Sequence, residues 1–390
     1  MKFVRARHLL LLLSGPLVIY AVFGGVLGRA LARDSAYRYL SVFQDVVTLV
    51  MNNYVDAVQM DGVLEGGIRG MMEALDSDSA YLSPEEFAKF QNPGEQDAAG
   101  IGVELTKRYY LSVVGVLPDS AAEKAGLQPG DLLKSVGGRN TREISVAIGE
   151  SILRGPAGAT IDLQVIRGRQ PDPIEVSVKR EVYSGDVVAY KTLTGSIGYI
   201  RIAAFRPGVD EEVTSAVRSM TGDGATALVV DVRNSFGRTA AEGSQVAELF
   251  VSGGVAAILE NRAGDKTELA IESGRVVFDG PITVLANRGT STAAEIFGSA
   301  IQHAERGELV GERTAGRGVV QKAIPLDDGS GLVLAVSQYL TPKGETLLGK
   351  GLEPTVEVKD SSFQADNGDG DPVLEKAIEI LSKSTVRKAA

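Results

Sequence analysis

The sequence lacks cysteine and tryptophan and has only two histidines in 390 residues. The absence of cysteine excludes disulfides, zinc–thiolate sites and cysteine proteases. The two histidines, His8 and His303, are too few to build a metal site from a cluster of histidines. A Ser-His-Asp triad would have to use His303, but the expected helix carries that residue away from the nearest hydroxyl-rich turn. We therefore predict chemistry that uses no metal, no other cofactor and no histidine base.

The charge balance indicates no nucleic-acid partner. The chain carries 40 basic and 50 acidic residues, a formal net charge of −10, which argues against a nucleic-acid binder. Its hydrophobic fraction of 44% and charged fraction of 23% are ordinary for a globular protein. The length allows more than one domain with a sizeable core.

One long apolar run stands near the N-terminus. Three basic residues within residues 2–7 precede Leu9–Gly28, which is long enough to cross a bilayer as a helix. A cleaved signal peptide is the alternative, because Ala30–Ala32 offers a suitable cleavage site. We expect residues 1–33 to be a signal anchor, with the membrane as a partner, or a signal peptide. Either would place the rest of the chain outside the cytoplasm, in the periplasm of a Gram-negative cell.

Residues 34–96 are predicted to be mainly helical. Apolar residues recur at helical spacing over Tyr37–Tyr54 and Asp61–Leu75. The segment Asp76–Leu82 (DSDSAYL) follows, and its acids could suggest a calcium loop. The ligand spacing of an EF-hand is missing, so a turn capped by its own side chains is favoured.

Short strands and glycine turns are expected over residues 97–182, with helices at Ala121–Ala125 and Ser145–Ile152. The run AGLQPGDLLKSVGG resembles the signature of a PDZ domain. That resemblance implies that the loop before the first strand binds the C-terminal carboxylate of a peptide, which would add as a strand beside the second helix. The expected peptide-binding residues are Gly100, Ile101, Gly102, Val103 and Ile148. The apolar ones among them would form the groove walls, which implies tails with apolar terminal residues.

Residues 183–359 alternate between strand and helix patterns, which predicts an α/β core built on a parallel sheet. Residues 360–390 read as an acidic linker followed by a short helix over Pro372–Leu381. The expected core elements are Ile197–Ile202, Asp210–Met220, Ala227–Val232, Ser244–Phe250, the hairpin Val255–Glu260 with Lys266–Ile271, Pro281–Ala286, a helix from Ala293, Glu308–Gly311, Val319–Ile324 and Leu332–Tyr339.

Two turns within this core carry the candidate chemistry. The buried strand Pro281–Ala286 leads through Asn287–Thr292, a turn crowded with hydroxyls, into a helix. Strand, tight turn and helix form a layout that exposes a nucleophile at the edge of a sheet. The second turn, Arg313–Gly318, leads into the strand Val319–Ile324.

These turns resemble the active centre of the C-terminal processing (tail-specific) serine proteases. The family's first turn reads roughly Asn-Gly-Gly-Ser-Ala-Ser-Ala-Ser-Glu-Ile, and the serine three before the glutamate is the nucleophile. Its second turn ends Gly-Lys-Gly-Ser-Val-Gln, with the lysine as general base and the glutamine orienting it. With Glu295 fixing the register, the nucleophile position is Thr292, the base position is Arg317 and the glutamine is Gln321.

The resemblance extends to two further motifs, each with a departure. Family members read Leu-Asp-Pro-His-Ser-Ser-Tyr-Leu where this chain has Leu75–Leu82, without the proline and the histidine. They also read Asp-Leu-Arg-Asn-Asn-Pro-Gly-Gly at an oxyanion-hole turn. Gly237 is kept there, while Arg238 replaces the second glycine and would be strained if that position needed a positive φ.

The two central substitutions bear directly on catalysis. Arginine has five donors and no acceptor, so Arg317 cannot take a proton from a hydroxyl. The extra methyl of Thr292 restricts its χ1 angle within a site shaped for serine. We therefore predict a catalytically degenerate member that binds the C-terminal tails of exported proteins through its PDZ domain, alone, as a homo-oligomer or paired with an active relative. The alternative is an active serine-type endopeptidase that uses a threonine nucleophile or another base.

Overall fold

The computed structural model describes residues 38–92, 94, 99–107, 109–168, 170, 172–194, 196–359 and 370–389. The predicted anchor or signal peptide at residues 1–33 lies outside this part of the chain. Within the described residues, no helix combines the length and the apolar character needed to span a membrane. The chain divides into two compact units, Met1–Ile68 and Arg69–Ala390, which are described separately.

The described part of the first unit is helical, as predicted. One helix covers residues 38–53, and α2 (Met60–Glu73) begins within this unit. The ring of Phe43 closes on Gly67, where an added Cβ would lie 3.4 Å from it. None of residues 38–68 is buried, and Leu40 and Leu49 are 62% and 61% exposed. The apolar spacing of these helices therefore does not correspond to a closed core within the unit.

The second unit contains a small antiparallel sheet over the region that resembles a PDZ domain. Its strand order is β2-β3-β4-β6-β7, with β5 paired to β4. Leu105, Leu111 and Leu163 fill the core of this sheet and are fully buried. The elements are β2 (Val103–Lys107), β3 (Leu111–Val116), α4 (Ala121–Lys124), β4 (Leu132–Val136), β5 (Arg139–Asn140), η2 (Thr141–Glu143), α5 (Val146–Leu153), β6 (Thr160–Ile166) and β7 (Ile174–Lys179).

The larger sheet of the second unit confirms the predicted α/β core. Its order is β19-β16-β15-β11-β9-β8; all neighbouring pairs are parallel except β8 with β9. Every residue of β11 and β15 is buried, which explains why both read as unbroken apolar runs. The strands are β8 (Val188–Leu193), β9 (Ile197–Ile202), β11 (Ala227–Asp231), β15 (Ile282–Ala286), β16 (Gly307–Gly311) and β19 (Val356–Glu357).

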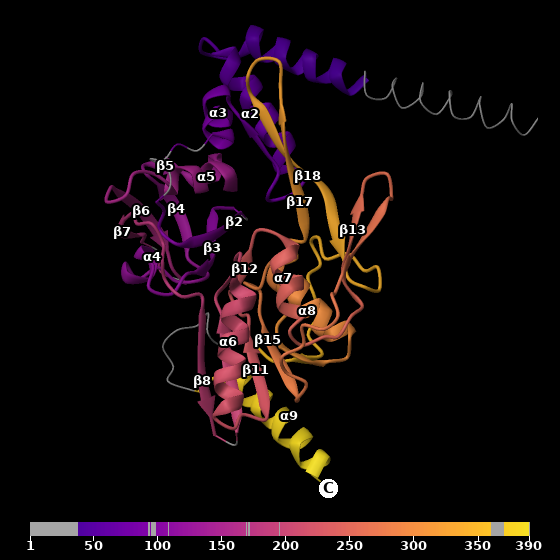
Figure 1. Cartoon of the computed structure of the whole chain (residues 1–390). Helices are drawn as coiled ribbons and strands as arrows, with labels where there is room; N and C mark the ends of the chain where they lie inside the picture. Colours follow the sequence, from indigo (N-terminus) through magenta and orange to yellow (C-terminus); the bar gives the residue numbers. More distant parts are fainter. Residues whose placement is uncertain are drawn as a thin grey trace, which may run out of the picture. The chain divides into compact units, whose positions relative to one another are not determined.

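Helices bury both faces of this sheet. On one face α6 (Val209–Gly222), α7 (Ala240–Ala247) and α8 (Ala293–His303) share a core that includes Phe250 and Phe297. Figure 1 shows α6 running alongside β8, and it also contacts β9. On the other face α9 (Pro372–Ala389) packs Val373 and Ala377 against the sheet. The sheet is therefore the central layer of three.

Two helices differ from their predicted bounds. The helix expected over Ser244–Phe250 begins earlier, at Ala240, because its first turn packs onto α8 where Gly243 meets the backbone of Ala293. The C-terminal helix α9 continues past the predicted end at Leu381 to Ala389. The apolar spacing of the sequence predicts neither the contact of α7 with α8 nor the extension of α9 beyond Leu381.

A second sheet completes this unit, with the order β1-β18-β13-β14 and β17 paired to β18. The predicted hairpin is confirmed as β13 (Val255–Asn261) and β14 (Lys266–Ala270). Strand β1 (Ala80–Leu82) was not predicted, and it pairs with β18 (Gly331–Leu340). Because β17 (Val319–Pro325) pairs with the same β18, the turn before β1 comes to lie beside the turn before β17. A capping box at Ser83 then starts α3 (Pro84–Gln91).

Candidate active site

The candidate site forms where β11 and β15 end. These neighbouring parallel strands run in register, with Asp231 opposite Leu285. The turn after β11 leads to Gly237, and the turn after β15 leads to Thr292. The carboxyl ends of adjacent parallel strands meet at one edge of a sheet, so the two turns lie side by side.

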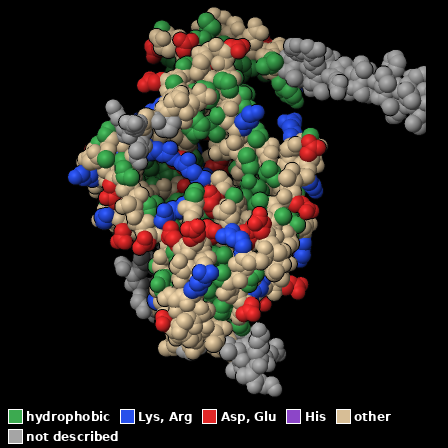
Figure 2. All heavy atoms as spheres, viewed as in Figure 1, with side chains coloured by type: hydrophobic (Ala, Val, Ile, Leu, Met, Phe, Trp, Pro, Cys, Tyr) green, Lys and Arg blue, Asp and Glu red, His purple; other side chains and the backbone are tan. Residues whose placement is uncertain are grey.

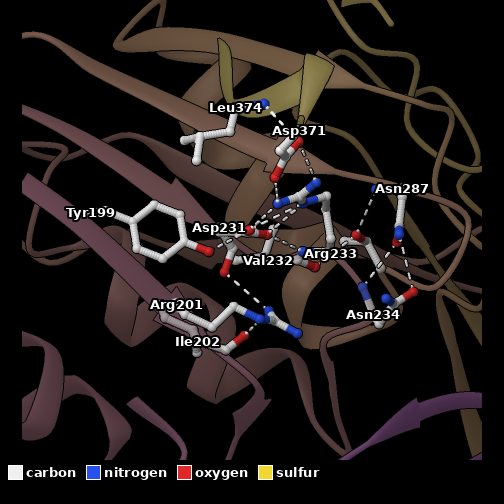
Figure 3. Close-up of polar contacts among 11 residues, drawn as sticks. Tyr199, Arg201, Ile202, Asp231, Val232, Arg233, Asn234, Asn287, Asp371 and Leu374 are labelled. Carbon is white, nitrogen blue, oxygen red and sulfur yellow. Dashed lines mark hydrogen bonds and ion pairs between the residues drawn. The ribbon is translucent and has the colours of Figure 1, made fainter. Parts of the chain in front are cut away.

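The side chain of Asn287 ties the two turns together. Its Oδ1 accepts hydrogen bonds from the N–H groups of Asn234 and Gly289 at 2.9 and 3.0 Å, and its Nδ2 donates to Asn234 Oδ1 at 3.0 Å. The hydroxyl of Thr290 adds a bond to the carbonyl of Val232 at 2.8 Å. Figure 3 shows Asn287 and Asn234 facing each other across this junction. The predicted strand–turn–helix layout is thus present, and hydrogen bonds from Asn287 and Thr290 stabilise it.

Thr292 stands at the N-cap of α8 with an unusual backbone. Its φ of 45° and ψ of −102° lie in a region that non-glycine residues rarely occupy, at a cost of about 1–3 kcal/mol. The hydroxyl donates to the carbonyl oxygen of Arg317 at 3.2 Å. A strained backbone therefore presents this hydroxyl to a main-chain acceptor.

Glu295 fastens the turn that carries Thr292 to the turn that carries Arg317. Its buried carboxylate accepts from the N–H groups of Thr292, Gly316 and Arg317 at 2.9, 2.7 and 3.0 Å. The hydroxyl of Thr314 donates to it at 2.5 Å. Burial raises the pKa of Glu295, and these four donors act in the opposite direction. In the sequence Glu295 served only to fix the register, and its role as a link between the turns comes from the structure.

The side chain of Arg317 pairs with two acids. Its Nη2 lies 2.5 Å from Asp78 Oδ1, and its Nη1 lies 3.0 Å from Glu104 Oε1 and 2.8 Å from the carbonyl of Leu105. Burial alone would lower the pKa of Arg317, but the two carboxylates outweigh it and raise the pKa above its ordinary value. The guanidinium is therefore charged at every physiological pH and has no lone pair to offer.

Gln321, the third predicted position, meets the same turn as Arg317. Its Nε2 donates to the carbonyl of Asp78 at 2.8 Å. Asp76 caps that turn by accepting from the N–H groups of Asp78 and Ser79, which confirms the capped turn in place of a calcium loop. Among the described residues no cluster of acids and histidines could hold a metal ion. Sequence reasoning missed Asp78 as a partner of Arg317, although the family motif marks its position by a histidine.

Gly237 lies where a side chain would not fit. It belongs to β12 (Phe236–Gly237), which pairs in parallel with β10 (Ala204–Phe205). A Cβ at Gly237 would lie 2.7 Å from the Cβ atoms of both Ala293 and Phe205. The strain considered for Arg238 does not arise, because that residue is not among those with a positive φ. Position 237 needs glycine because a side chain there would clash. Arg238, the next residue, has an ordinary backbone conformation and an exposed side chain.

The predicted PDZ residues divide between a core and a cavity. Gly100 exchanges backbone hydrogen bonds with Glu181 at 3.0 and 2.9 Å, so its N–H is already used. Ile148 is 2% exposed, packs inside the PDZ core and is not among the residues that line the cavity beside Ile101. Ile101 and Val103 do line a cavity of about 470 Å³. The helical spacing of α5 could not tell its buried face from the face turned towards the cavity.

A second cavity, of about 540 Å³, contains Thr292, Arg317 and Gln321. This catalytic cavity and the PDZ-side cavity share a rim, since both are lined by Gly237 and Arg238. Figure 2 shows acidic and basic side chains gathered around the hollowed middle of the face it presents. The other shared lining residues are Glu104, Glu150, Arg154 and Thr239.

Comparison with known proteins bears on these sites. A model of peptidase family S41 matches residues 196–358, and a PDZ-domain model matches residues 112–167. The carboxy-terminal processing protease CtpA of Bacillus subtilis is 30% identical over 313 residues, which cover 80% of this chain and 67% of the relative. The chain belongs to the carboxyl-terminal processing protease family. A carboxyl-terminal-processing protease of Synechocystis is 29% identical over 325 residues, covering 81% of this chain and 76% of that protein.

A solved structure agrees with the family in fold. The photosystem II D1 C-terminal processing protease superposes with a TM-score of 0.66 over 87% of this chain and 96% of its own, at 24% identity. This likeness supports the mixed α/β protease fold with a PDZ domain.

In this carboxyl-terminal processing protease-like chain, a buried ion cluster lies directly behind the β11 turn. Figure 3 shows Arg233 held between Asp231 and Asp371, with Tyr199 and Arg201 also contacting Asp231. Arg233 Nη2 lies 2.6 Å from Asp231 and 2.7 Å from Asp371. Burial would raise the pKa of Asp231, but Arg201 and Arg233 hold it below its ordinary value. The cluster ties the turn after β11 to the first residues of α9.

Proposed function

We propose that this chain binds the C-terminal tails of exported proteins through its PDZ domain and hydrolyses them weakly or not at all, alone or beside an active relative. The supporting observation is that the Arg317 side chain is a charged guanidinium bound by two carboxylates. Its guanidinium is ion-paired with Asp78 and Glu104, where catalysis would need a proton acceptor. The residues before Leu9–Gly28 and that run itself support export.

Loss of the base is the main obstacle to hydrolysis. A hydroxyl becomes a useful nucleophile only when a neighbouring group takes its proton. The Thr292 hydroxyl donates to the carbonyl of Arg317, and a backbone carbonyl is far too weak a base to remove that proton. The strained Thr292 backbone and the glycine at position 237 keep the outline of the site without its base.

Two substitutions away from the family pattern match each other. Arg317 stands at the lysine position, and Asp78 stands at the histidine position of the Leu-Asp-Pro-His motif. A catalytic lysine needs surroundings that favour its neutral form, whereas a buried arginine needs an anion beside it. The 2.5 Å contact between Arg317 and Asp78 joins the two changed positions. This pairing favours a site rebuilt around a permanent cation over a chance loss of one residue.

Peptide capture rests on the loop before β2 and on the edge of that strand. The N–H groups of Ile101 and Gly102 make no backbone hydrogen bond within the described residues, which leaves two donors for a terminal carboxylate. Strand β2 lies at the edge of its sheet, paired with β3 alone. An extended peptide can therefore add beside β2 and place its apolar end in the cavity lined by Ile101 and Val103.

An active endopeptidase remains the second candidate, because another carboxylate borders the catalytic cavity. Burial raises the pKa of Glu104 to about 7, against the opposing effect of Arg317. A carboxylate with a pKa near neutrality could serve as a general base through a water molecule. In that case Thr292 would attack, Gln321 would orient, and Gly237 with the Gly289–Ser291 turn would stabilise the oxyanion.

A cleavage assay separates the two candidates. An unstructured protein ending in apolar residues is incubated with the native chain, with T292S/R317K, and with T292S/R317K/D78H. The binding role predicts no fragments from the native chain and fragments once the lysine is restored, most readily when histidine replaces Asp78. Native cleavage that disappears in Thr292→Ala would establish the endopeptidase and refute the binding role.

A binding assay with the same protein completes the test. The native chain should retain the unstructured protein and lose it when the terminal carboxylate is amidated. Equal retention of the amidated form would show that the PDZ loop does not read the chain end.

A further inference from the structure

The rim shared by the two cavities carries a cation with an unusual position. Arg238 lines both the PDZ-side cavity and the catalytic cavity, and its side chain is exposed. A tail held beside β2 and reaching towards Thr292 would cross this rim, which Glu104, Glu150 and Arg154 also border. A tail residue that crosses beside Arg238 can meet its guanidinium.

The other charges along the PDZ-side cavity already have partners. Arg206 pairs with Glu212 at 2.8 Å, and Glu104 pairs with Arg317 at 3.0 Å. Arg154 and Glu150 face each other at 3.9 Å, and Glu242 accepts from the Thr239 hydroxyl. Within the part of the chain that the structure describes, the Arg238 side chain makes neither an ion pair nor a hydrogen bond. Its donors are therefore available to a ligand.

A carboxylate is the group that best complements an accessible guanidinium. Its two oxygens can accept the parallel N–H donors of the fork, which a neutral amide does with less charge. The apolar walls at Ile101, Val103 and Phe205 suit the last residues of the tail, while Arg238 stands farther along the path towards Thr292. The two features address different positions of one peptide.

We propose that Arg238 is a specificity-determining residue that selects tails with an acidic side chain upstream of their apolar C-terminus. This inference rests on the proposed tail-binding function and adds a substrate class to it. It also gives a physical role to the residue that replaces the family's second glycine.

The test measures the affinity of fluorescent peptides for the purified chain by anisotropy. All peptides end in the same apolar residues, and a glutamate or its matched glutamine is moved one position at a time away from that end. At one position the native chain should prefer glutamate about two- to fivefold at low salt, as expected for an exposed pair. The preference should shrink as salt is raised, because the charges are accessible to water.

Variants assign the preference to one side chain. R238Q should abolish it and R238E should invert it, since neither change removes a buried contact. R206Q is the matched control, because Arg206 lines only the PDZ-side cavity and is already paired. It should leave the preference intact.

Two outcomes overturn the proposal in distinguishable ways. Equal affinity for glutamate and glutamine peptides at every position, or a preference that survives in R238Q, refutes the role of Arg238 while tail binding stands. Failure of the native chain and of R238Q to bind any of the peptides refutes tail binding itself, and the specificity with it.

Discussion

The Thr292 hydroxyl donates to the backbone carbonyl of Arg317 at 3.2 Å, while the Arg317 side chain pairs with Asp78 and Glu104. One residue thus holds the nucleophile turn with its main chain and two other segments with its side chain. Asp78 belongs to the turn before β1, and Glu104 belongs to strand β2 of the PDZ domain. Arg317 is therefore a structural junction between these three segments.

Removing Asp78 should destabilise this junction. In D78N, Arg317 keeps Glu104 and the Leu105 carbonyl but loses the charge at 2.5 Å, in a site where both partners are mostly buried. Breaking a buried pair leaves an uncompensated charge, so the free energy of unfolding should fall by about 2–4 kcal/mol. Urea denaturation measures the change.

The control for D78N is an ion pair at the surface. Arg313 and Glu353 also pair, but their side chains are 52% and 69% exposed. E353Q should change stability by less than about 0.5 kcal/mol. If D78N proved as mild as E353Q, Asp78 would not be the anion that holds Arg317.

The alternating strand and helix patterns were enough to predict the α/β core. β11 and β15 read as apolar runs because each is buried on both faces, and the hydroxyl turn was placed correctly between β15 and α8. Aligning the family motif on Glu295 selected Thr292, Arg317 and Gln321, and these three residues line one cavity. Local periodicity carries this kind of information because it depends on which faces of an element are buried.

Long-range contacts were beyond local reasoning. Asp78 and Arg317 are 239 positions apart, and they meet only because the three-residue strand β1 pairs with β18. Strands of that length have no period to detect. The burial of Ile148 is beyond local reasoning for a related reason, since α5 is apolar on more than one face and only the sheet beneath it decides which face is buried.

The protonation of Glu104 should make the stability of the folded chain depend on pH. Burial raises its pKa to about 7 in the folded chain, above the value of 4.5 for an unperturbed glutamate. The folded state therefore binds a proton more tightly than the unfolded state does. Protonation of Glu104 therefore adds to the free energy of unfolding. This contribution is fully present below a pH of about 4.5 and is lost as the pH rises through about 7.

Comparison with E104Q isolates this contribution. The stability of the native chain relative to E104Q should fall by up to about 3 kcal/mol between pH of about 5 and 8. Denaturant titrations across that range measure it, and the same substitution at the exposed Glu268 serves as the control. A difference that rises with pH would mean that Arg317, and not burial, dominates the surroundings of Glu104.

Gly237 should tolerate no side chain. An alanine Cβ there would lie 2.7 Å from the Cβ atoms of Ala293 and Phe205, and 2.8 Å from the Phe205 carbonyl oxygen. Either the β10–β12 pair or the start of α8 has to shift, which should cost about 1–3 kcal/mol and weaken peptide binding. At Gly222, the end of α6, an added Cβ would meet no heavy atom within 4 Å, so G222A should be neutral or slightly stabilising. Equal stabilities of the two variants would show that the turn at Gly237 yields freely.

The ion pair between Arg233 and Asp371 should couple α9 to the turn after β11. Asp371 meets Arg233 through bonds of 3.0 and 2.7 Å, and its Oδ1 also accepts from the N–H of Leu374 at the start of α9. D371N keeps an N-cap oxygen, because asparagine caps helices as well as aspartate does, but it removes the charge. Stability should fall by about 1–2 kcal/mol, and amide hydrogen exchange should speed up both in α9 and around Asn234.

The joint response distinguishes coupling from simple fraying of the helix. Glu379, which pairs with Lys376 and Lys383 on the exposed side of α9, supplies the control. E379Q can loosen α9 locally but has no path to Asn234, so exchange at the turn should stay at the native rate. If D371N accelerated exchange in α9 while Asn234 kept its native rate, Arg233 would be held well enough by Asp231 alone. The turn that leads to Gly237 would then be independent of the C-terminal helix.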